Sequence, residues 1–175
     1  MIFKILNSGS QSINKRQKML LFFVFSLIFV IDRVSKVYVY GNSTIVKFED
    51  IAITSFFNLT LVINDGVSFG MLSGLGARYF ILAVTILISL VLIFLVVTAK
   101  NFYEKLAYCT ILSGAAGNIT DRATIGGVVD FIDFHIGAYH WPAFNVADSA
   151  IFVGVCLLIC IEIGGFIKKN QGNKA

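Results

Sequence analysis

The chain has 175 residues, of which 57% are hydrophobic and only 14% are charged, and its mean hydropathy is +0.85. Soluble domains carry about 25% charged residues, so this composition excludes an ordinary soluble protein and predicts a membrane protein. The net charge of +4 does not indicate nucleic-acid binding, because the Lys and Arg residues lie between apolar segments rather than in a stripe among exposed aromatic residues. Residues 1–175 are expected to form one domain.

Four apolar segments are long enough, alone or together with their charged ends, to cross a bilayer, which takes about 20 residues of helix. We expect membrane spans at residues 19–40, 79–99, 106–122 and 148–167, with outer segments at 41–78 and 123–147. The second span has an uncharged apolar run of full length. The first and third carry charges in their last turns.

Basic residues are distributed unevenly between the two sides that these spans define. Nine of the 14 Lys and Arg residues lie on the side of both termini and five on the other. Basic residues are enriched in cytoplasmic segments, so we expect both termini in the cytoplasm. The charged ends of the first and third helices then lie at the outer face.

The two outer segments differ in pattern. Residues 51–63 are rich in Ile, Thr and Phe and alternate in polarity, which predicts short strands before a stretch with four glycines between residues 66 and 76. Residues 125–145 are expected to form a loop at the membrane interface, where the amphipathic ring of Trp141 suits the headgroup level. The predicted fold class is therefore an all-α membrane protein of four transmembrane helices, with a small β-rich extracytoplasmic segment between helices 1 and 2.

Polar groups gather at the predicted outer ends of the helices. Asp32 and Lys36 are four residues apart and could form an ion pair, and a pair that neutralises itself at the membrane edge explains this spacing as well as a functional site does. Asn118, Asp121 and Arg122 project from one face of the third helix. A purely structural polar cluster is equally compatible with their spacing.

Two further carboxylates, Asp130 and Asp148, lie in or near the second outer segment. Asn145 and Asp148 are three residues apart at the start of the last helix, where either side chain could cap the exposed backbone N–H groups. Composition and topology alone do not separate Asp130 and Asp148 from Asp121, from Asp133 or from a helix cap.

Other site chemistries find little support in the sequence. His135 and His140 do not form a His-Glu-x-x-His pattern, and neither a Gly-x-Ser-x-Gly elbow nor a phosphate-binding loop occurs. The three cysteines lie inside apolar stretches and are expected to be packing residues. We expect no metal site.

Five motifs occur in order along the chain: Asp-Arg-Val-Ser-Lys at 32–36, Asn-Asp-Gly-Val-Ser-Phe-Gly at 64–70, Gly-Asn-Ile-Thr-Asp-Arg at 117–122, Val-Val-Asp-Phe at 128–131 and Phe-Asn-Val-Ala-Asp-Ser at 144–149. In this order, and at these ends of the predicted spans, the motifs resemble those of lipoprotein signal peptidase, the bacterial signal peptidase II family. The resemblance extends from Asp32 to Gly154.

The resemblance implies an aspartyl protease of the bacterial inner membrane that cuts diacylglyceryl-modified prolipoproteins just before the lipidated cysteine. It implies no metal or organic cofactor and no nucleic-acid partner, and we expect a monomer whose partners are prolipoprotein substrates and membrane lipids. Carried over by motif, Asp130 and Asp148 are the implied catalytic dyad. The implied substrate-binding or dyad-orienting residues are Asp32, Lys36, Asn64, Gly66, Asn118, Asp121, Arg122 and Asn145.

Two alternatives belong to other functional classes. A small proton-coupled transporter would favour carboxylates strung across the depth of the bilayer and an inverted repeat with discontinuous helices. The carboxylates of this chain cluster at one face instead, and no such repeat is visible. A structural scaffold would predict that amide replacements at Asp130 and Asp148 change no activity.

Overall fold

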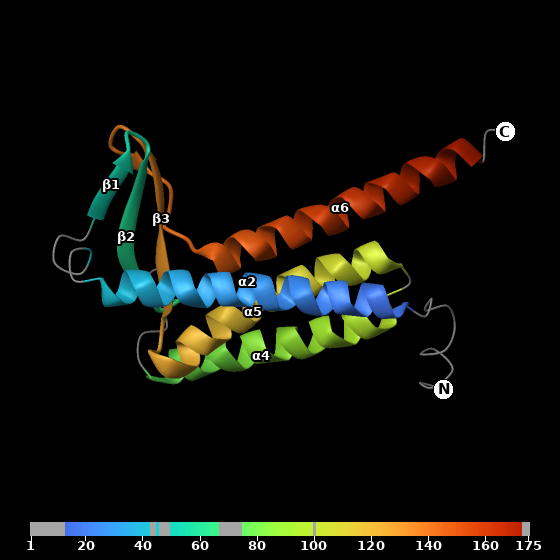
Figure 1. The fold of residues 1–175 in the computed structure, drawn as a ribbon, viewed down its shortest axis with the longest axis horizontal. Coiled ribbons are helices and arrows are strands. Elements are labelled where there is room, and N and C mark those ends of the chain that lie inside the picture. The colour runs from blue at the N-terminus through green and yellow to red at the C-terminus, as the bar shows by residue number, and fades with distance from the viewer. Residues whose placement is uncertain (1–12, 43–44, 46–49, 67–74, 100, 173–175) are drawn as a thin grey trace.

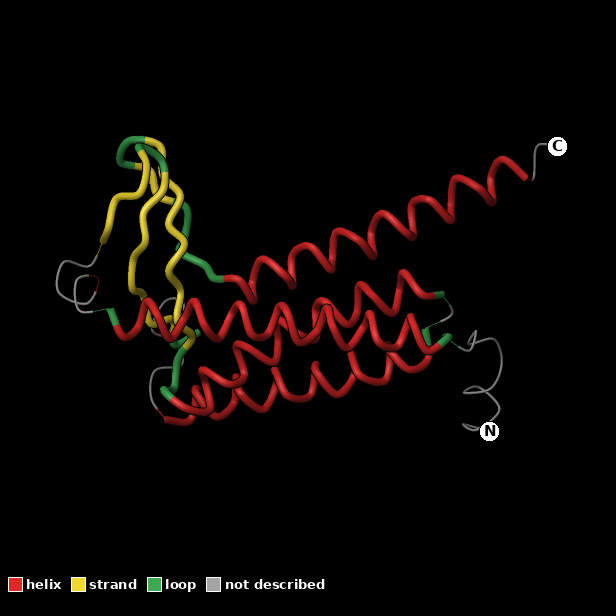
Figure 2. Tube along the Cα trace, in the orientation of Figure 1, coloured by secondary structure: helices red, strands yellow, loops and turns green. Residues whose placement is uncertain are grey.

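The computed structural model of the protein describes residues 13–42, 45, 50–66, 75–99 and 101–172. The described chain is mostly helical and carries one small antiparallel sheet at one end of the helices (Figures 1 and 2). The helices are α2 (Lys15–Gly41), α4 (Leu75–Thr98), α5 (Phe102–Thr124) and α6 (Val146–Gly172). The strands are β1 (Asp50–Thr54), β2 (Phe57–Asn64), β3 (Val128–Ile136) and β4 (Tyr139–His140).

Each predicted span overlaps one helix, and the ends differ by a few residues. Capping side chains set the starts of α2 and α5. Asn14 caps α2 in a capping box with Gln17, so the helix begins at Lys15. Asn101 caps α5 by accepting a hydrogen bond from the Glu104 N–H. These polar residues precede the apolar runs, which is why hydropathy alone places the starts of these two helices too late.

Helix α5 is the central helix, because α2, α4 and α6 all pack against it. Small residues permit the close approach of α5 and α6: a Cβ atom at Gly114 would collide with the Ala147 carbonyl oxygen, and one at Gly154 would press on Ile111. Figure 1 shows α6 beginning beside the other helices and leaning away from them toward its C-terminus. The close contact is therefore concentrated in the first half of α6.

The sheet has the order β1-β2-β3-β4, with antiparallel pairing throughout. Its first two strands confirm the strands predicted for residues 51–63. The expectation that residues 125–145 form a loop was wrong, since β3 and β4 occupy part of this segment and β3 pairs with β2, for example Ile63 with Val129. Residues 67–74, which hold part of the predicted glycine-rich stretch, lie outside the described residues.

A small apolar core fixes the sheet to the end of the bundle. Val39 of α2 and Ile45 are buried together with Val129 and Phe131 of β3. Because β3 continues directly from α5 and leads into α6, this core brings the ends of three helices to the base of the sheet. The candidate site forms at that junction.

Two helices in the described chain, Arg78–Thr98 and Val146–Ile167, are long and apolar enough to cross a membrane by length and composition. Large apolar side chains also lie on the outward surface, among them Phe22 of α2, Leu87 of α4 and Phe152 of α6, each more than 60% exposed. So many exposed large apolar side chains indicate contact with an apolar partner or a membrane. The prediction of four spans with cytoplasmic termini stays a prediction.

Candidate active site

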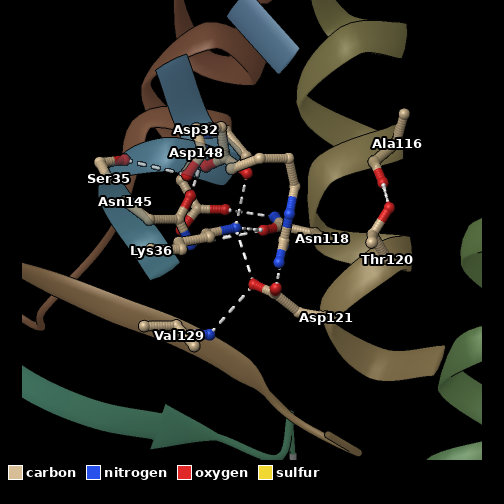
Figure 3. Close-up of polar contacts among 12 residues, drawn as sticks. Asp32, Ser35, Lys36, Ala116, Asn118, Thr120, Asp121, Val129, Asn145 and Asp148 are labelled. Carbon is tan, nitrogen blue, oxygen red and sulfur yellow. Dashed lines mark hydrogen bonds and ion pairs between the residues drawn. The ribbon is translucent and has the colours of Figure 1, made fainter. Parts of the chain in front are cut away.

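Side chains from α2, α5, α6, β2 and β3 meet at the junction of the bundle and the sheet. Figure 3 shows those of α2, α5 and the start of α6. This is where the last turns of α2 and α5 end and where α6 begins. Residues far apart in the sequence thereby become neighbours, as expected from the clustering of polar groups at one face of the predicted bundle.

A buried cation organises the side of the site nearest α2. The Lys36 ammonium lies 3.0 Å from Asp32 Oδ2 and 2.9 Å from Asp121 Oδ2, and it donates to Asn118 Oδ1 at 2.9 Å. The two carboxylates and the ammonium are each no more than 1% exposed. The predicted ion pair between Asp32 and Lys36 is therefore present, and it forms part of a larger network rather than an isolated surface pair.

Asp32 and Asp121 extend this network to the backbones of neighbouring elements. Asp32 Oδ1 accepts a hydrogen bond from the Ala147 N–H at 2.9 Å, and Asp121 Oδ2 accepts one from the Val129 N–H at 3.2 Å. Asp121 also pairs with Arg33. The first bond fixes the start of α6 to α2, and the second fixes β3 to α5, so both carboxylates hold the framework of the site.

Two asparagine side chains link the carboxylates of Asp130 and Asp148. Asn145 Nδ2 donates to Asp130 Oδ1 at 2.6 Å and lies 3.4 Å from Asn118 Oδ1, while Asn118 Nδ2 donates to Asp148 Oδ1 at 2.8 Å. We call this sequence of amide groups the amide relay. Because Lys36 binds the same Asn118 oxygen, the relay is also tied to the buried cation (Figure 3).

Asn64 holds the other oxygen of Asp130. Its Nδ2 donates to Asp130 Oδ2 at 2.9 Å, and its Oδ1 accepts the Gly66 N–H at 2.9 Å. Gly66 has a φ of +77°, which other residues rarely adopt. The turn after β2 therefore orients the Asn64 amide so that both oxygens of Asp130 accept an amide hydrogen.

Asp130 is 1% exposed, and its environment favours the protonated acid. Burial raises the pKa of Asp130 to about 6, the negative charge of Asp148 also raises it, and the hydrogen bonds from Asn64 and Asn145 oppose the shift. A carboxyl group with such a pKa can hold a proton near neutral pH and donate it within the site. Sequence reasoning placed this residue in a loop, whereas it lies in the paired strand β3.

Asp148 lies in the first turn of α6, a position that favours negatively charged side chains. Its backbone N–H donates to Asn145 Oδ1 at 2.8 Å, so Asn145 supplies the helix cap. The alternative that Asp148 serves as the N-cap is therefore wrong. The Asp148 carboxylate therefore does not cap the helix; it accepts a hydrogen bond from Asn118 and can interact with a bound substrate.

Arg122 lies apart from the cation network. Asn118, Asp121 and Arg122 were expected to point to one place, but only Asn118 and Asp121 contact Lys36. The Arg122 guanidinium lies on the Gly66 side of the site, where the negative charges of Asp148 and Asp130 act on it. Its backbone oxygen accepts a hydrogen bond from Arg78 at 3.2 Å. Sequence analysis missed Arg78, whose only signal is a cation at the start of an apolar helix.

Asp133 belongs to a separate cluster along the sheet. It accepts hydrogen bonds from Asn58 Nδ2 at 3.0 Å and from His140 Nδ1 at 2.9 Å, and the His140 ring stacks on His135. No bond links this cluster to the amide relay among the hydrogen bonds of the described residues. Within those residues, no group of three or more His, Cys, Asp or Glu side chains has a metal-binding arrangement.

Comparison with known proteins decides the family. The model of the signal peptidase (SPase) II family matches residues 24–163. The chain belongs to the signal peptidase II family. The prediction made from its five motifs is therefore confirmed. Membership of this family supports a membrane protease that acts on prolipoprotein signal peptides. The transporter alternative gains no support.

The chain is similar to individual members of this family in sequence and to a solved membrane enzyme in fold. It is 41% identical to the lipoprotein signal peptidase of Francisella tularensis subsp. novicida over 89% of this chain and 98% of that one. It is 38% identical to the lipoprotein signal peptidase of Alteromonas mediterranea over 86% of this chain and 84% of that one. A solved bacterial membrane enzyme with 30% identity superimposes with a TM-score of 0.72 over 89% of this chain and 92% of the other.

Proposed function

We propose that this protein is an aspartic endopeptidase that removes the signal peptide of diacylglyceryl-modified prolipoproteins by cleaving before the lipidated cysteine. The observation that carries the proposal is the amide relay, which joins one buried and one partly exposed carboxylate, Asp130 and Asp148, through Asn145 and Asn118. Family membership supports the protease activity. The contrast between the two carboxylates supports the aspartic mechanism.

Peptide hydrolysis by this route needs one carboxylate that takes a proton and a second that gives one. Burial raises the pKa of Asp130 to about 6 and so favours its protonated form. In that form its O–H gives its proton to the scissile carbonyl oxygen. The Asp148 carboxylate takes a proton from water while the water oxygen bonds to the carbonyl carbon. In the second step Asp148 passes this proton to the leaving nitrogen, the C–N bond breaks, and Asp130 recovers its proton as the new carboxyl group forms.

The amide relay and Asn64 give this reaction its geometry. They fix the Asp130 carboxyl plane and the Asp148 Oδ1 atom before substrate arrives, and such preorganisation lowers the cost of reaching the reactive arrangement. Arg122, Gly66 and Lys36 complete the surroundings as orienting or substrate-binding groups.

The proposed topology places this reaction at the outer surface of the bacterial inner membrane. We propose that α2, α4, α5 and α6 all cross the bilayer, that both termini are cytoplasmic, and that the protein acts as a monomer. The uneven distribution of basic residues supports the cytoplasmic placement of the termini. The packing of α5 against both apolar helices and of α2 against α6 supports four helices that cross the bilayer together. A lipid-anchored cysteine would keep its scissile bond at the same depth as the dyad.

The test is cleavage of a diacylglyceryl-modified precursor by membranes that contain Asp130→Asn or Asp148→Asn protein. Each change should lower the rate at least about a hundredfold, because it removes a proton-transfer group. Undiminished cleavage by either variant would refute the aspartic mechanism and would favour a purely structural role for the pair.

Asp133→Asn is the matched control, since Asp133 lies three residues from Asp130 on the same strand and is also buried. It should keep activity, although the loss of charge-assisted bonds from Asn58 and His140 should lower its stability. The comparison is therefore made at a temperature at which every variant is folded.

A further inference from the structure

An apolar cavity of about 420 Å³ opens beside the dyad. Its walls are the aromatic residues Trp141 and Phe144 and one face of α6, and Asp148 is one of its lining residues. On α6 the lining residues Ser149, Phe152 and Val153 share that face, because residues three and four apart on a helix lie together. The volume is within the range of sites that bind small molecules.

The aromatic walls are held by backbone hydrogen bonds and exist before any ligand binds. The Phe144 carbonyl accepts the N–H groups of Phe131 and Ile132 at 3.0 and 2.8 Å, and the Phe144 N–H donates to the Ile132 carbonyl at 3.1 Å. The Trp141 N–H donates to the Phe134 carbonyl at 2.8 Å. The segment that leads from the sheet into α6 is therefore fixed to β3, and the cavity is a built feature.

The position of Asp148 connects the cavity to one side of the scissile bond. In the proposed reaction, Asp148 delivers a proton to the leaving nitrogen, and that nitrogen belongs to the lipidated cysteine. The lipid group therefore enters the site on the Asp148 side. The cavity beginning at Asp148 is apolar, whereas the groups on the Asp130 side, Asn64 and Asn145, are polar.

We infer that this cavity receives an acyl chain of the substrate's diacylglyceryl group. The inference rests on the proposed function and adds to it the way in which the enzyme recognises lipidation. Lipid tails are as apolar as leucine side chains, so moving a chain from the bilayer into the cavity gains little from apolar burial. The gain is positional: a chain held between Trp141 and Phe152 places the bond before its cysteine next to the dyad, and a precursor without the chain lacks that restraint.

Filling the far end of the cavity tests the inference. Val153 lies five residues beyond Asp148, about 7.5 Å along the helix at 1.5 Å per residue, so Val153→Trp should block a long chain while leaving room for a short one. We expect kcat/KM to fall about tenfold for a precursor with two palmitoyl groups, an effect typical of a hydrophobic pocket that loses a good fit. For a precursor with two butyryl groups it should change less than about twofold on the same scale.

Val155→Trp is the matched control, since Val155 lies on the same helix, is exposed, and falls outside the cavity lining. It should affect neither precursor. Unchanged palmitoyl cleavage by Val153→Trp, or an equal loss with both precursors, would overturn the inference while leaving the proposed function intact. Failure of the unaltered enzyme to cleave either precursor would overturn the proposed function and the inference with it.

A second experiment does not depend on the folding of the Trp variant. Asp130→Asn protein, whose change lies outside the cavity lining, is incubated with a precursor that carries a photoreactive diazirine in one acyl chain. After irradiation, mass spectrometry should find the label on Trp141, Phe144, Phe152 or Val153. Label confined to the outward face of α4, or to Ile136 and Tyr139 at the far end of the sheet, would contradict the assignment.

Discussion

Asn145 Nδ2 donates to Asp130 Oδ1 at 2.6 Å, and this contact joins the two halves of the proposed dyad. The oxygen of the same amide accepts the Asp148 backbone N–H at 2.8 Å and so caps α6. One side chain therefore fixes the carboxyl group of the strand residue and the helix turn that carries the other acid. A single substitution can separate these two roles.

Asn145→Ser should keep the cap and lose the contact with Asp130. Serine is as good an N-cap as asparagine, but it has no amide group that reaches Asp130 and Asn118 together. We expect cleavage to fall about tenfold to a hundredfold, from the loss of preorganised hydrogen bonds. Cleavage assays on the purified variant, with helix content followed by circular dichroism, would measure both effects.

Asn145→Ala is the companion variant, because it removes the cap as well. It should be as inactive as the serine variant and less stable than that variant by about 1 kcal/mol. Full activity in Asn145→Ser would show that the amide contact with Asp130 is dispensable.

The pH dependence of cleavage should reflect the protonation of Asp130. Its pKa of about 6 predicts that kcat/KM falls as the pH rises through that value, because the acid that polarises the carbonyl is then lost. Asn64→Ala should move this fall to higher pH, since the Asn64 amide stabilises the ionised form. Rates measured from pH 4 to 9 with a lipidated precursor would test both statements.

Asn58→Ala provides the control for the pH experiment. Asn58 lies on the same strand as Asn64 and donates in the same way, but to Asp133. Removing the Asn58 amide should leave the pH at which kcat/KM falls unchanged. A profile that shifts equally in both variants would mean that the shift comes from damage to the sheet.

Asp130 should also make folding stability depend on pH. Its folded pKa of about 6 lies above the ordinary value of 3.8, so between these values the native state binds more protons than the unfolded state. The free energy of unfolding should therefore decrease as the pH rises from about 4 to 6, by up to about 3 kcal/mol. Denaturant titrations in detergent should show this slope for the wild-type protein and a smaller one for Asp130→Asn.

Sequence reasoning recovered the helices and the polar cluster because both depend on local signals. Apolar runs mark helices, and the spacing of Asp32 and Lys36 is sufficient to place their charges on one helix face. The sequence could not show that Lys36 also contacts Asp121 and Asn118, because those contacts depend on how α2 packs on α5. The motif resemblance supplied the proposed dyad, which spacing alone left undecided.

The strand β3 shows why part of the fold was missed. Its sequence is rich in Val, Ile and Phe, as strands are, but Asp130, Asp133 and His135 interrupt the apolar pattern, and the expectation for residues 125–145 was a loop. Its partner β2 precedes it by more than 60 residues, and a pairing over that distance has no local signature. Strand β2 supplies the amide partners of the two buried carboxylates: Asn58 stands opposite Asp133, and Asn64, opposite Val128, reaches Asp130 diagonally.

Lys36→Met should strongly destabilise the protein, because Lys36 compensates the buried charge of Asp32 and shares that of Asp121. Removing one partner of a buried ion pair costs about 3 to 5 kcal/mol, a large part of a typical total stability of 5 to 15 kcal/mol. Arg33 still pairs with Asp121, so the uncompensated charge would be that of Asp32. Chemical denaturation in detergent would measure the loss.

The double variant Lys36→Met, Asp32→Asn identifies the cause of that loss. The asparagine removes the uncompensated charge and keeps an oxygen that can accept the Ala147 N–H at the start of α6. We expect the double variant to be more stable than Lys36→Met alone, which is the signature of coupling between two contacting residues. If the two changes instead destabilise additively, the ammonium acts chiefly through Asn118 and the amide relay rather than by balancing charge.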